Sequence, residues 1–112
     1  MKYAVLIYGA EAAWDELSEA DQQATLGEYI AISQHPSIVG GAQLQAPETA
    51  TTVRAANGSP LMTDGPYPET KDVLGGFFLV EADDLDAAVE LAARVPAAKT
   101  GGAVEVRPIV ER

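Results

Sequence analysis

Apolar residues occur in distinct runs along this chain, and three of the runs predict strands of a buried sheet. Residues 2–8, Lys-Tyr-Ala-Val-Leu-Ile-Tyr, are β-branched and aromatic and end at Gly9. Residues 74–81 form a second run of this kind around two phenylalanines. Near the end of the sequence, residues 104–110 alternate apolar and charged side chains, and Pro108 suits an edge strand or a strand end. We expect residues 2–8 to form a buried central strand.

Two segments carry start and stop signals for helices. Ser18 is the predicted N-cap of the first, which Pro36 ends, and its packed face is expected to hold small residues: Ala20, Ala24, Gly27 and Ala31, with Ile30 beside them. The pair Asp83-Asp84 begins the second helix, and Pro96 stops it. The predicted apolar stripe of this helix is Leu85, Ala88, Val89, Ala92 and Val95.

The middle of the chain predicts a further strand and a hairpin. Residues 38–45 have strand character, and residues 51–55 and 61–63 flank Asn57-Gly58, a strong signal for a two-residue hairpin turn. Without that hairpin, the element order is β-α-β-β-α-β. This order predicts one α+β domain over residues 1–112, ferredoxin-like, with an antiparallel sheet that both helices cover on one face.

The strands that contain Leu6, Phe77 and Val106 are apolar on both faces, although the predicted helices cover only one. The second face therefore needs a cover. We expect a homodimer in which the sheets of two copies pack face to face.

Composition narrows the classes of function. The formal net charge of −10 argues against direct binding of nucleic acid or an anionic membrane, since both require a basic face. The sequence contains no cysteine, which excludes disulfides, thiolate catalysis and thiolate metal sites. No apolar stretch approaches the roughly 18 residues of a membrane helix, and the first apolar run is too short for a signal peptide. We expect a cytoplasmic protein.

Residues 63–71, Thr-Asp-Gly-Pro-Tyr-Pro-Glu-Thr-Lys, are the densest group of turn-forming and polar residues in the chain. Asp64 can accept hydrogen bonds from nearby backbone N–H groups, Gly65 tolerates positive φ, and the two prolines keep their neighbours out of the helical region. Such a stiff loop holds four side chains in constant relative positions: Asp64, Tyr67, Glu69 and Lys71. Two interpretations stay open, a binding edge and an ordinary turn.

The remaining candidates are few. For ligand binding they are Tyr8, Tyr67, Lys71 and Arg107, whose ordinary alternatives are half-buried packing, surface ion pairs and a cross-strand partner. His35 is the single histidine and a weak catalytic candidate beside Asp64; alternatively, it is a solvated residue at a helix C-terminus. No metal site, phosphate loop, nucleophile elbow or dinucleotide fingerprint is present, so no cofactor is indicated. Three Gly-Gly pairs are typical of strand starts, bulges or close approaches.

Several of these motifs together resemble the YCII-related family, in its DGPF branch. They are Asp64 to Lys71, then Leu-Gly-Gly-Phe-Phe at 74–78, then Glu-Val-Arg-Pro at 105–108, and the resemblance covers essentially the whole chain. Tyr67 stands where the branch has phenylalanine. The resemblance implies a dimeric α+β barrel. It implies no assigned reaction, although a His and an Asp have been suggested as catalytic in the wider family, and some relatives are fused to a sigma-factor domain.

That His–Asp pair transfers only in part. The histidine of the wider family lies within the first helix, whereas His35 falls at the end of that helix; Asp64 matches the branch motif. Two functions follow as hypotheses. One is a small-molecule enzyme using acid–base chemistry in a cleft near the Asp-Gly-Pro loop, with Asp64 exchanging protons and Tyr8, Tyr67 or Arg107 orienting the substrate. The other is a non-catalytic ligand-binding or protein-interaction domain, linked to sigma-factor-dependent transcription.

Overall fold

A computed structural model describes residues 1–10, 12–66 and 71–112 of the chain. The elements are β1 (Lys2–Ala10), α1 (Glu19–Ser33), β2 (Ile38–Gln43), the 3-10 helix η1 (Pro47–Thr49), β3 (Thr51–Ala56), β4 (Ser59–Asp64), β5 (Asp72–Glu81), α2 (Leu85–Ala92), α3 (Pro96–Lys99) and β6 (Ala103–Pro108). Among the described elements, four strands form an antiparallel sheet in the order β2-β5-β1-β6, and β3 and β4 form a separate two-stranded sheet. The predicted α+β, ferredoxin-like fold with an extra hairpin is confirmed.

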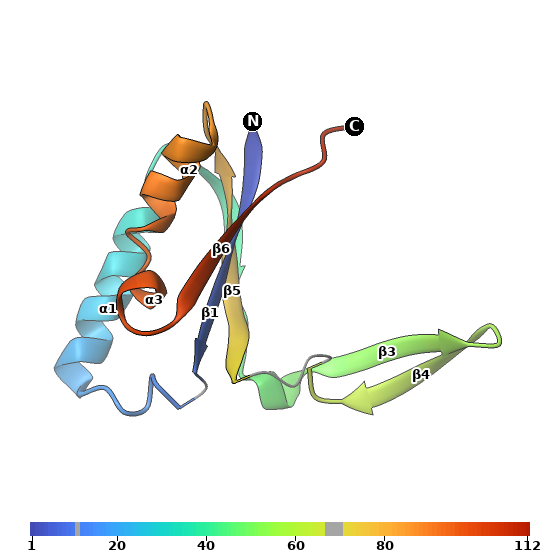
Figure 1. Cartoon of the computed structure of the whole chain (residues 1–112). Coiled ribbons are helices and arrows are strands. Elements are labelled where there is room, and N and C mark those ends of the chain that lie inside the picture. Colours follow the sequence, from blue (N-terminus) through green and yellow to red (C-terminus); the bar gives the residue numbers. More distant parts are fainter. Residues whose placement is uncertain (11, 67–70) are drawn as a thin grey trace.

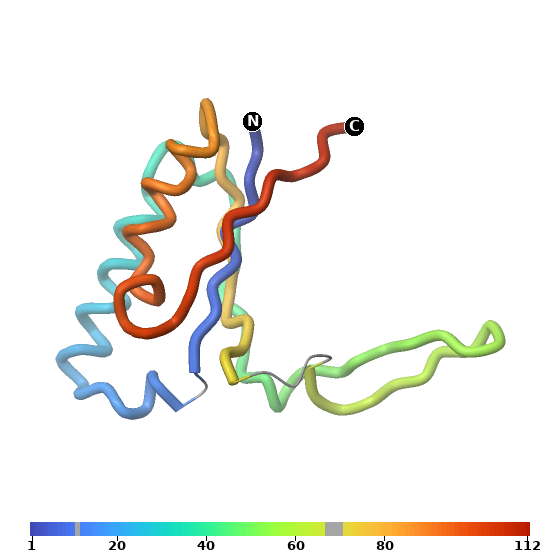
Figure 2. The backbone as a smooth tube through the Cα atoms, viewed as in Figure 1, coloured from blue at the N-terminus to red at the C-terminus, as the bar shows by residue number. Residues whose placement is uncertain are grey.

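The helices and the hairpin leave the sheet on opposite sides. All three α-helices cover one face, which we call the helix face, and the other face is open (Figure 1). The hairpin of residues 51–64, called the arm below, projects from the lower end of the sheet on the open side (Figure 2). The molecule is consequently flat and L-shaped, with extents of 45 × 43 × 19 Å.

The core lies between the sheet and the helices. Tyr3 and Val5 of β1 and Val80 of β5 are each about 1% exposed, and they pack with Ile32, Ala88, Leu91, Ala92 and Val95 from the helical layer. Each large side chain buried in this way contributes roughly 1.5–3 kcal/mol. β1 lies between β5 and β6, so the prediction of a buried central strand is confirmed.

The open face of the sheet is apolar at its centre. Because side chains alternate along β1 and Tyr3, Val5 and Ile7 pack into the core, Leu6 and Tyr8 face the other way. Phe77 is the β5 partner of Leu6, and paired residues share a face. The central strands are therefore apolar on both faces, as expected from the sequence.

Both predicted helix starts are correct. The Ser18 side chain accepts a hydrogen bond from the Asp21 N–H at 3.1 Å, and the Asp84 carboxylate accepts one from the Ala87 N–H at 2.9 Å. Each bond satisfies one of the N–H groups that a helix leaves unpaired at its start. Pro96 not only follows α2 but also begins α3, a position where its missing N–H removes no bond.

The predicted packing faces of the helices need correction. In α1 the small residues Ala20, Ala24, Gly27 and Ala31 are exposed, and Ile30 is 58% exposed. The face toward the sheet instead follows Gln22, Thr25, Tyr29 and Ile32. In the second helix, Ala88, Ala92 and Val95 are buried as predicted. Leu85 and Val89 are about half exposed, and Leu91 is buried in their place. Tyr29 and Ile32 bury more apolar area than alanines would, which favours this rotation of α1.

Glycines allow close approaches and a bulge in the sheet. The register of β1 against β5 shifts between Ile7 and Tyr8, where Gly75 is the additional residue. A Cβ on Gly76 would lie 2.9 Å from the Ala42 carbonyl oxygen, and one on Gly102 would clash with the Tyr8 carbonyl oxygen. The predicted roles of the Gly-Gly pairs are confirmed.

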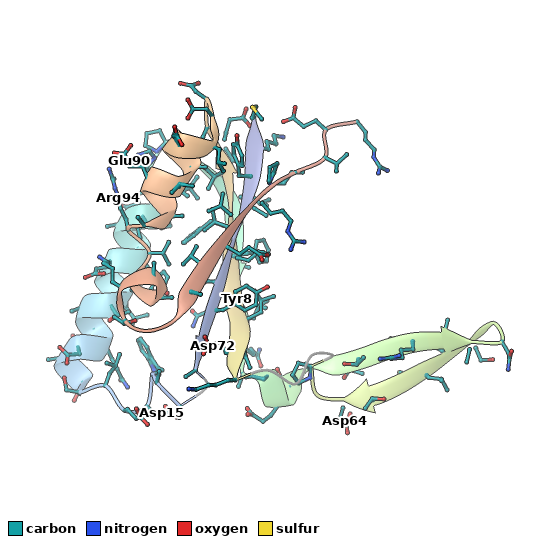
Figure 3. The ribbon with its side chains drawn as sticks, in the orientation of Figure 1. Tyr8, Asp15, Asp64, Asp72, Glu90 and Arg94 are labelled. Carbon is teal, nitrogen blue, oxygen red and sulfur yellow. The ribbon has the colours of Figure 1, made fainter. Side chains whose placement is uncertain are left out.

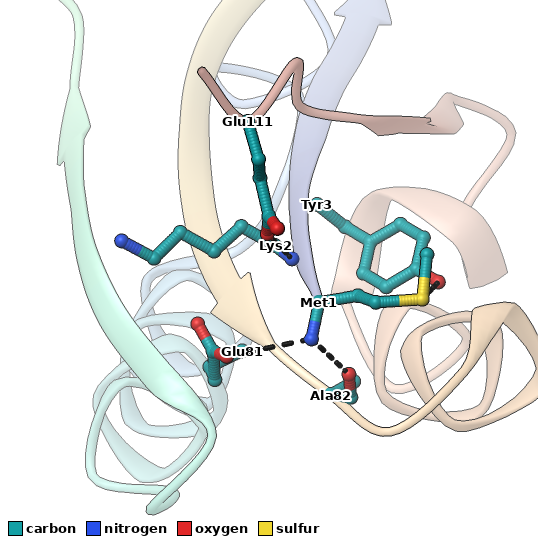
Figure 4. A network of polar contacts seen from close by, with 6 residues as sticks. All are labelled: Met1, Lys2, Tyr3, Glu81, Ala82 and Glu111. Atoms are coloured by element: carbon teal, nitrogen blue, oxygen red, sulfur yellow. Dashed lines mark hydrogen bonds and ion pairs between the residues drawn. The ribbon is translucent and has the colours of Figure 1, made fainter.

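Polar contacts join the start of β1 to the end of β5 and to the last residues (Figure 4). The Met1 ammonium lies 3.4 Å from Glu81 Oε1 and donates to the Ala82 carbonyl oxygen at 3.0 Å. The Lys2 N–H donates to Glu111 Oε1 at 3.2 Å. These groups are exposed, so their charges stabilise the fold only weakly. Among the described residues, no helix is long and apolar enough to cross a membrane.

Candidate functional site at the foot of the arm

The turn at Asn57-Gly58 determines how the two strands of the arm pair. Asn57 and Gly58 both have positive φ, 52° and 79°, as a tight two-residue hairpin turn requires. The turn sets the register of β3 against β4, so that Val53 lies opposite Met62 and, at the foot, Thr51 lies opposite Asp64. The hairpin predicted from Asn57-Gly58 is confirmed.

Two hydrogen bonds hold the Asp-Gly-Pro loop against the start of β3. The Gly65 N–H donates to the Ala50 carbonyl oxygen at 2.7 Å, and the Thr52 hydroxyl donates to the Gly65 carbonyl oxygen at 2.6 Å. Gly65 itself has a φ of +96°, a conformation that glycine adopts without strain. The loop therefore leaves the arm at a defined angle.

Asp64 ends β4 with an exposed side chain (Figure 3). Within residues 1–10, 12–66 and 71–112, its carboxylate takes part in no hydrogen bond or ion pair. An aspartate in a simple turn accepts from the N–H two residues on, but Pro66 has no N–H, and the neighbouring Gly65 N–H bonds to Ala50. No described residue therefore bonds to either carboxylate oxygen, and both can accept a hydrogen bond from a ligand.

A groove of about 570 Å³ runs beside this loop along β3. Its lining residues are Ala50, Thr51, Thr52, Val53, Arg54 and Pro66. Arg54 and Thr52 supply a positive charge and a hydroxyl, and sequence reasoning had missed both. The register set by the Asn57-Gly58 turn could have identified them, because it places residues 51–54 alongside the strand that ends at Asp64.

The other predicted ligand-binding residues do not lie together: Tyr8 is near the arm, and Arg107 is far from Tyr8 along the sheet. Tyr8 is half-buried on the open face, toward the end of β1 nearest the arm (Figure 3). Lys71 is exposed just before β5. Tyr67 lies outside the described residues. Arg107 forms an ion pair with Glu105 at 3.1 Å and pairs with Ala4, about four strand residues or roughly 13 Å from the level of Tyr8.

His35 lies just after α1 and beside Val80 and Glu81 at the end of β5, whereas Asp64 precedes the start of that strand. Its Nδ1 accepts a hydrogen bond from the Ser37 N–H at 3.0 Å, which leaves Nε2 to carry the proton of the neutral ring. It lines a separate cleft of about 300 Å³ with Glu90 and Arg94. One subunit therefore does not bring His35 and Asp64 together.

Burial raises the pKa of Tyr29 on α1, because it disfavours the charged form of the phenol; a backbone hydrogen bond with Ala97 opposes the shift and Glu28 adds to it. Across the described part of the chain, no group of three or more His, Asp or Glu side chains is arranged to hold a metal ion.

Comparison with known proteins places the chain in a family. An uncharacterised protein of Rhizobium meliloti is 32% identical over 114 residues, which cover 97% of this chain and 92% of the relative. The structure of a 5-chloro-2-hydroxyhydroquinone dehydrochlorinase from Burkholderia phenoliruptrix, in complex with 2,5-dihydroxybenzoquinone, is similar at 18% identity. Its TM-score is 0.55, with 100% of this chain and 96% of that one covered, a likeness of fold alone. The family model for the YCII-related domain matches residues 1–112, and the chain belongs to that family.

Proposed function

We propose that this chain is a cytoplasmic small-molecule enzyme that uses Asp64 as its acid–base group. The observation that carries the proposal is the placement of Asp64: its carboxylate has no partner among the described residues, and Thr51, its partner in β3, lines a groove of about 570 Å³ together with Pro66 of the Asp-Gly-Pro loop. A carboxylate that is free to exchange a proton is the minimum equipment for proton abstraction next to a carbonyl group.

The chemistry balances as a proton transfer. The Asp64 carboxylate takes a proton from a C–H or O–H group conjugated to a carbonyl, and the electron pair of that bond stays on the substrate. The resulting enolate or phenolate oxygen carries the charge. Asp64 then returns the proton to another atom of the same molecule, so the net reaction is an isomerisation and needs no cofactor.

Water must be kept from such a site, and the groove is open on the arm of a single chain. We propose that the protein acts as a homodimer through the open face of the sheet, which places a second copy over the foot of the arm. Tyr8, on that face at the end of β1 nearest the arm, would then take part in orienting the substrate.

The comparisons support an enzyme in general terms. The fold neighbour is named a dehydrochlorinase of a hydroxyhydroquinone and was solved with a dihydroxybenzoquinone. Compounds of this class have acidic O–H groups conjugated to carbonyl or aromatic carbons, the kind of proton that a carboxylate can exchange. For this chain they are a first substrate class to test.

The test uses 2,5-dihydroxybenzoquinone as a binding probe and a panel of hydroxyquinones and 1,3-dicarbonyl compounds as substrates. We expect calorimetric binding of the probe and turnover of at least one compound by the wild type. Asp64→Asn keeps the side-chain shape and should lower kcat by about 100-fold or more. Asp86→Asn, which alters an exposed carboxylate on α2, is the matched control and should leave kcat unchanged. Equal turnover by Asp64→Asn and wild type would exclude this role for Asp64.

A second candidate is a non-catalytic ligand-binding or protein-interaction domain, the alternative predicted from the sequence. The observation that favours it is the outer face of α1, where Leu26 and Ile30 are 44% and 58% exposed one helical turn apart. Binding of the probe without turnover of any compound in the panel would favour this second function.

A further inference from the structure

The chain exposes more surface than a monomer of its mass. Its accessible surface is 7909 Å², whereas a monomeric protein of 11.7 kDa is expected to expose about 5,900 Å². The radius of gyration is 15.8 Å, against about 13 Å for a compact domain of this length. The excess of about 2,000 Å² per chain is of the size that obligate homodimers bury.

The arm accounts for the shape and has two unlike faces. Because paired residues share a face and neighbours alternate, one face carries Thr51, Val53, Ala55, Pro60, Met62 and Asp64, and the other carries Thr52, Arg54, Ala56, Ser59, Leu61 and Thr63. From the foot outward the first face is apolar, with Val53 60% and Met62 72% exposed. We call the stripe of Val53, Ala55, Pro60 and Met62 the apolar stripe.

No residue in the described part of the chain covers this stripe. Among the residues of β3 and β4, Thr52 alone is half-buried and the others are exposed. A two-stranded hairpin without tertiary packing is only marginally stable in water. A long exposed hairpin with an apolar stripe therefore needs a surface to pack on.

We propose that the arm reaches across to a second copy of this chain and packs its apolar stripe against that partner. The arm leaves the body on the same side as the open face of the sheet, so a twofold axis in front of that face would bring each arm beneath the other subunit (Figures 1 and 2). Each chain has a net charge of −10, so two copies repel each other wherever their acidic residues meet. The apolar stripe has no charged residue and allows contact without this repulsion.

The arrangement deepens the function proposed above and rests on it in one respect: the partner would supply the missing wall of the groove beside the Asp-Gly-Pro loop. Val53 belongs both to the lining of that groove and to the apolar stripe. The docked arm and the enclosed groove are then consequences of the same contact. The docking itself does not depend on catalysis and is tested without any substrate.

The first test is sedimentation velocity of two matched variants across nanomolar to micromolar concentrations. Met62→Glu places a charge in the apolar stripe. Leu61→Glu places the same charge at the neighbouring position, on the opposite face of the arm. We expect a wild-type dimer, a dissociation constant raised about 100-fold or more by Met62→Glu, and a change of less than about threefold for Leu61→Glu. A monomeric wild type, or equal effects of the two variants, would overturn the proposal. Circular dichroism confirms that both variants are folded.

The second test separates docking on the partner from folding back on the same chain. The sequence has no cysteine, so Ser59→Cys near the arm tip, opposite to the apolar stripe, accepts a single nitroxide label. Labelled chains are mixed with unlabelled ¹⁵N chains, so that any line broadening in the ¹⁵N spectrum is intermolecular. We expect broadening of a contiguous surface of the partner. Its absence in a mixture shown to exchange subunits would refute docking, whatever Asp64→Asn does to turnover.

Discussion

Gly41 of β2 lies directly against the backbone of Phe77 in β5. A Cβ at position 41 would stand 2.5 Å from the Phe77 carbonyl oxygen, and the φ of Gly41 is +149°. The register of β2 against β5 shifts just before this residue, between Ile38 and Gly40. The close approach of the two strands therefore depends on the absence of a side chain at this position.

Gly41→Ala should consequently destabilise the protein by about 2–4 kcal/mol, because both the backbone conformation and the contact with Phe77 oppose a methyl group. Urea unfolding followed by circular dichroism measures this change. The control is Gly27→Ala in α1, where a Cβ would meet nothing within 4 Å. It should stabilise the protein by about 0.5–1 kcal/mol, since alanine favours helix. Equal stability of Gly41→Ala and wild type would show that β2 adjusts freely.

Loss of the N-cap of α1 should have a smaller effect on the free energy of unfolding. Ser18→Ala removes the acceptor of the Asp21 N–H and should lower the free energy of unfolding by about 1 kcal/mol. Ser33→Ala is the matched control: the Ser33 hydroxyl donates only to the Ile30 carbonyl oxygen in the last turn, and its loss should change stability by less than about 0.5 kcal/mol. A larger loss from Ser33→Ala than from Ser18→Ala would contradict this account of the helix start.

Tyr29 predicts a decline of stability at alkaline pH. Burial raises the pKa of its phenol above the ordinary value of 10.0, so the folded chain holds this proton more tightly than the unfolded chain. The contribution of the Tyr29 phenol to stability is complete below pH 10.0, the pKa of this group in the unfolded chain, and is lost as pH rises through its pKa in the folded chain. Tyr29→Phe should flatten this decline in unfolding experiments, and the late-titrating tyrosine should vanish from its ultraviolet titration. An unchanged slope in Tyr29→Phe would refute the link.

His35 is expected to act on stability and not on the site at the arm. His35→Ala removes the acceptor of the Ser37 N–H and should destabilise the protein by about 1 kcal/mol. His35→Asn, which offers an oxygen near the position of Nδ1, should restore most of that loss. Both variants should bind 2,5-dihydroxybenzoquinone as the wild type does. If either variant lost turnover while remaining folded and dimeric, His35 would belong to the chemistry.

The features that followed from the sequence are those governed by neighbouring residues. Asn57-Gly58 determined the turn and thereby the register that places Thr51 opposite Asp64. Ser18 and Asp84 determined where helices begin, because their side chains bond to N–H groups three residues away. The apolar run of β1 identified the central strand. In each case the decisive interaction spans only a few residues, so the local pattern was sufficient.

Other features were decided by the tertiary structure. The stripe of small residues on α1 satisfied helical spacing, yet the sheet selected the face with Tyr29 and Ile32, because competition for buried area involves the whole core. The placement of Arg54 beside the Asp-Gly-Pro loop and the separation of His35 from Asp64 likewise depend on how distant segments meet. The direction of the arm was not evident from its own residues. Packing between segments far apart in the chain sets such features, and no local pattern contains them.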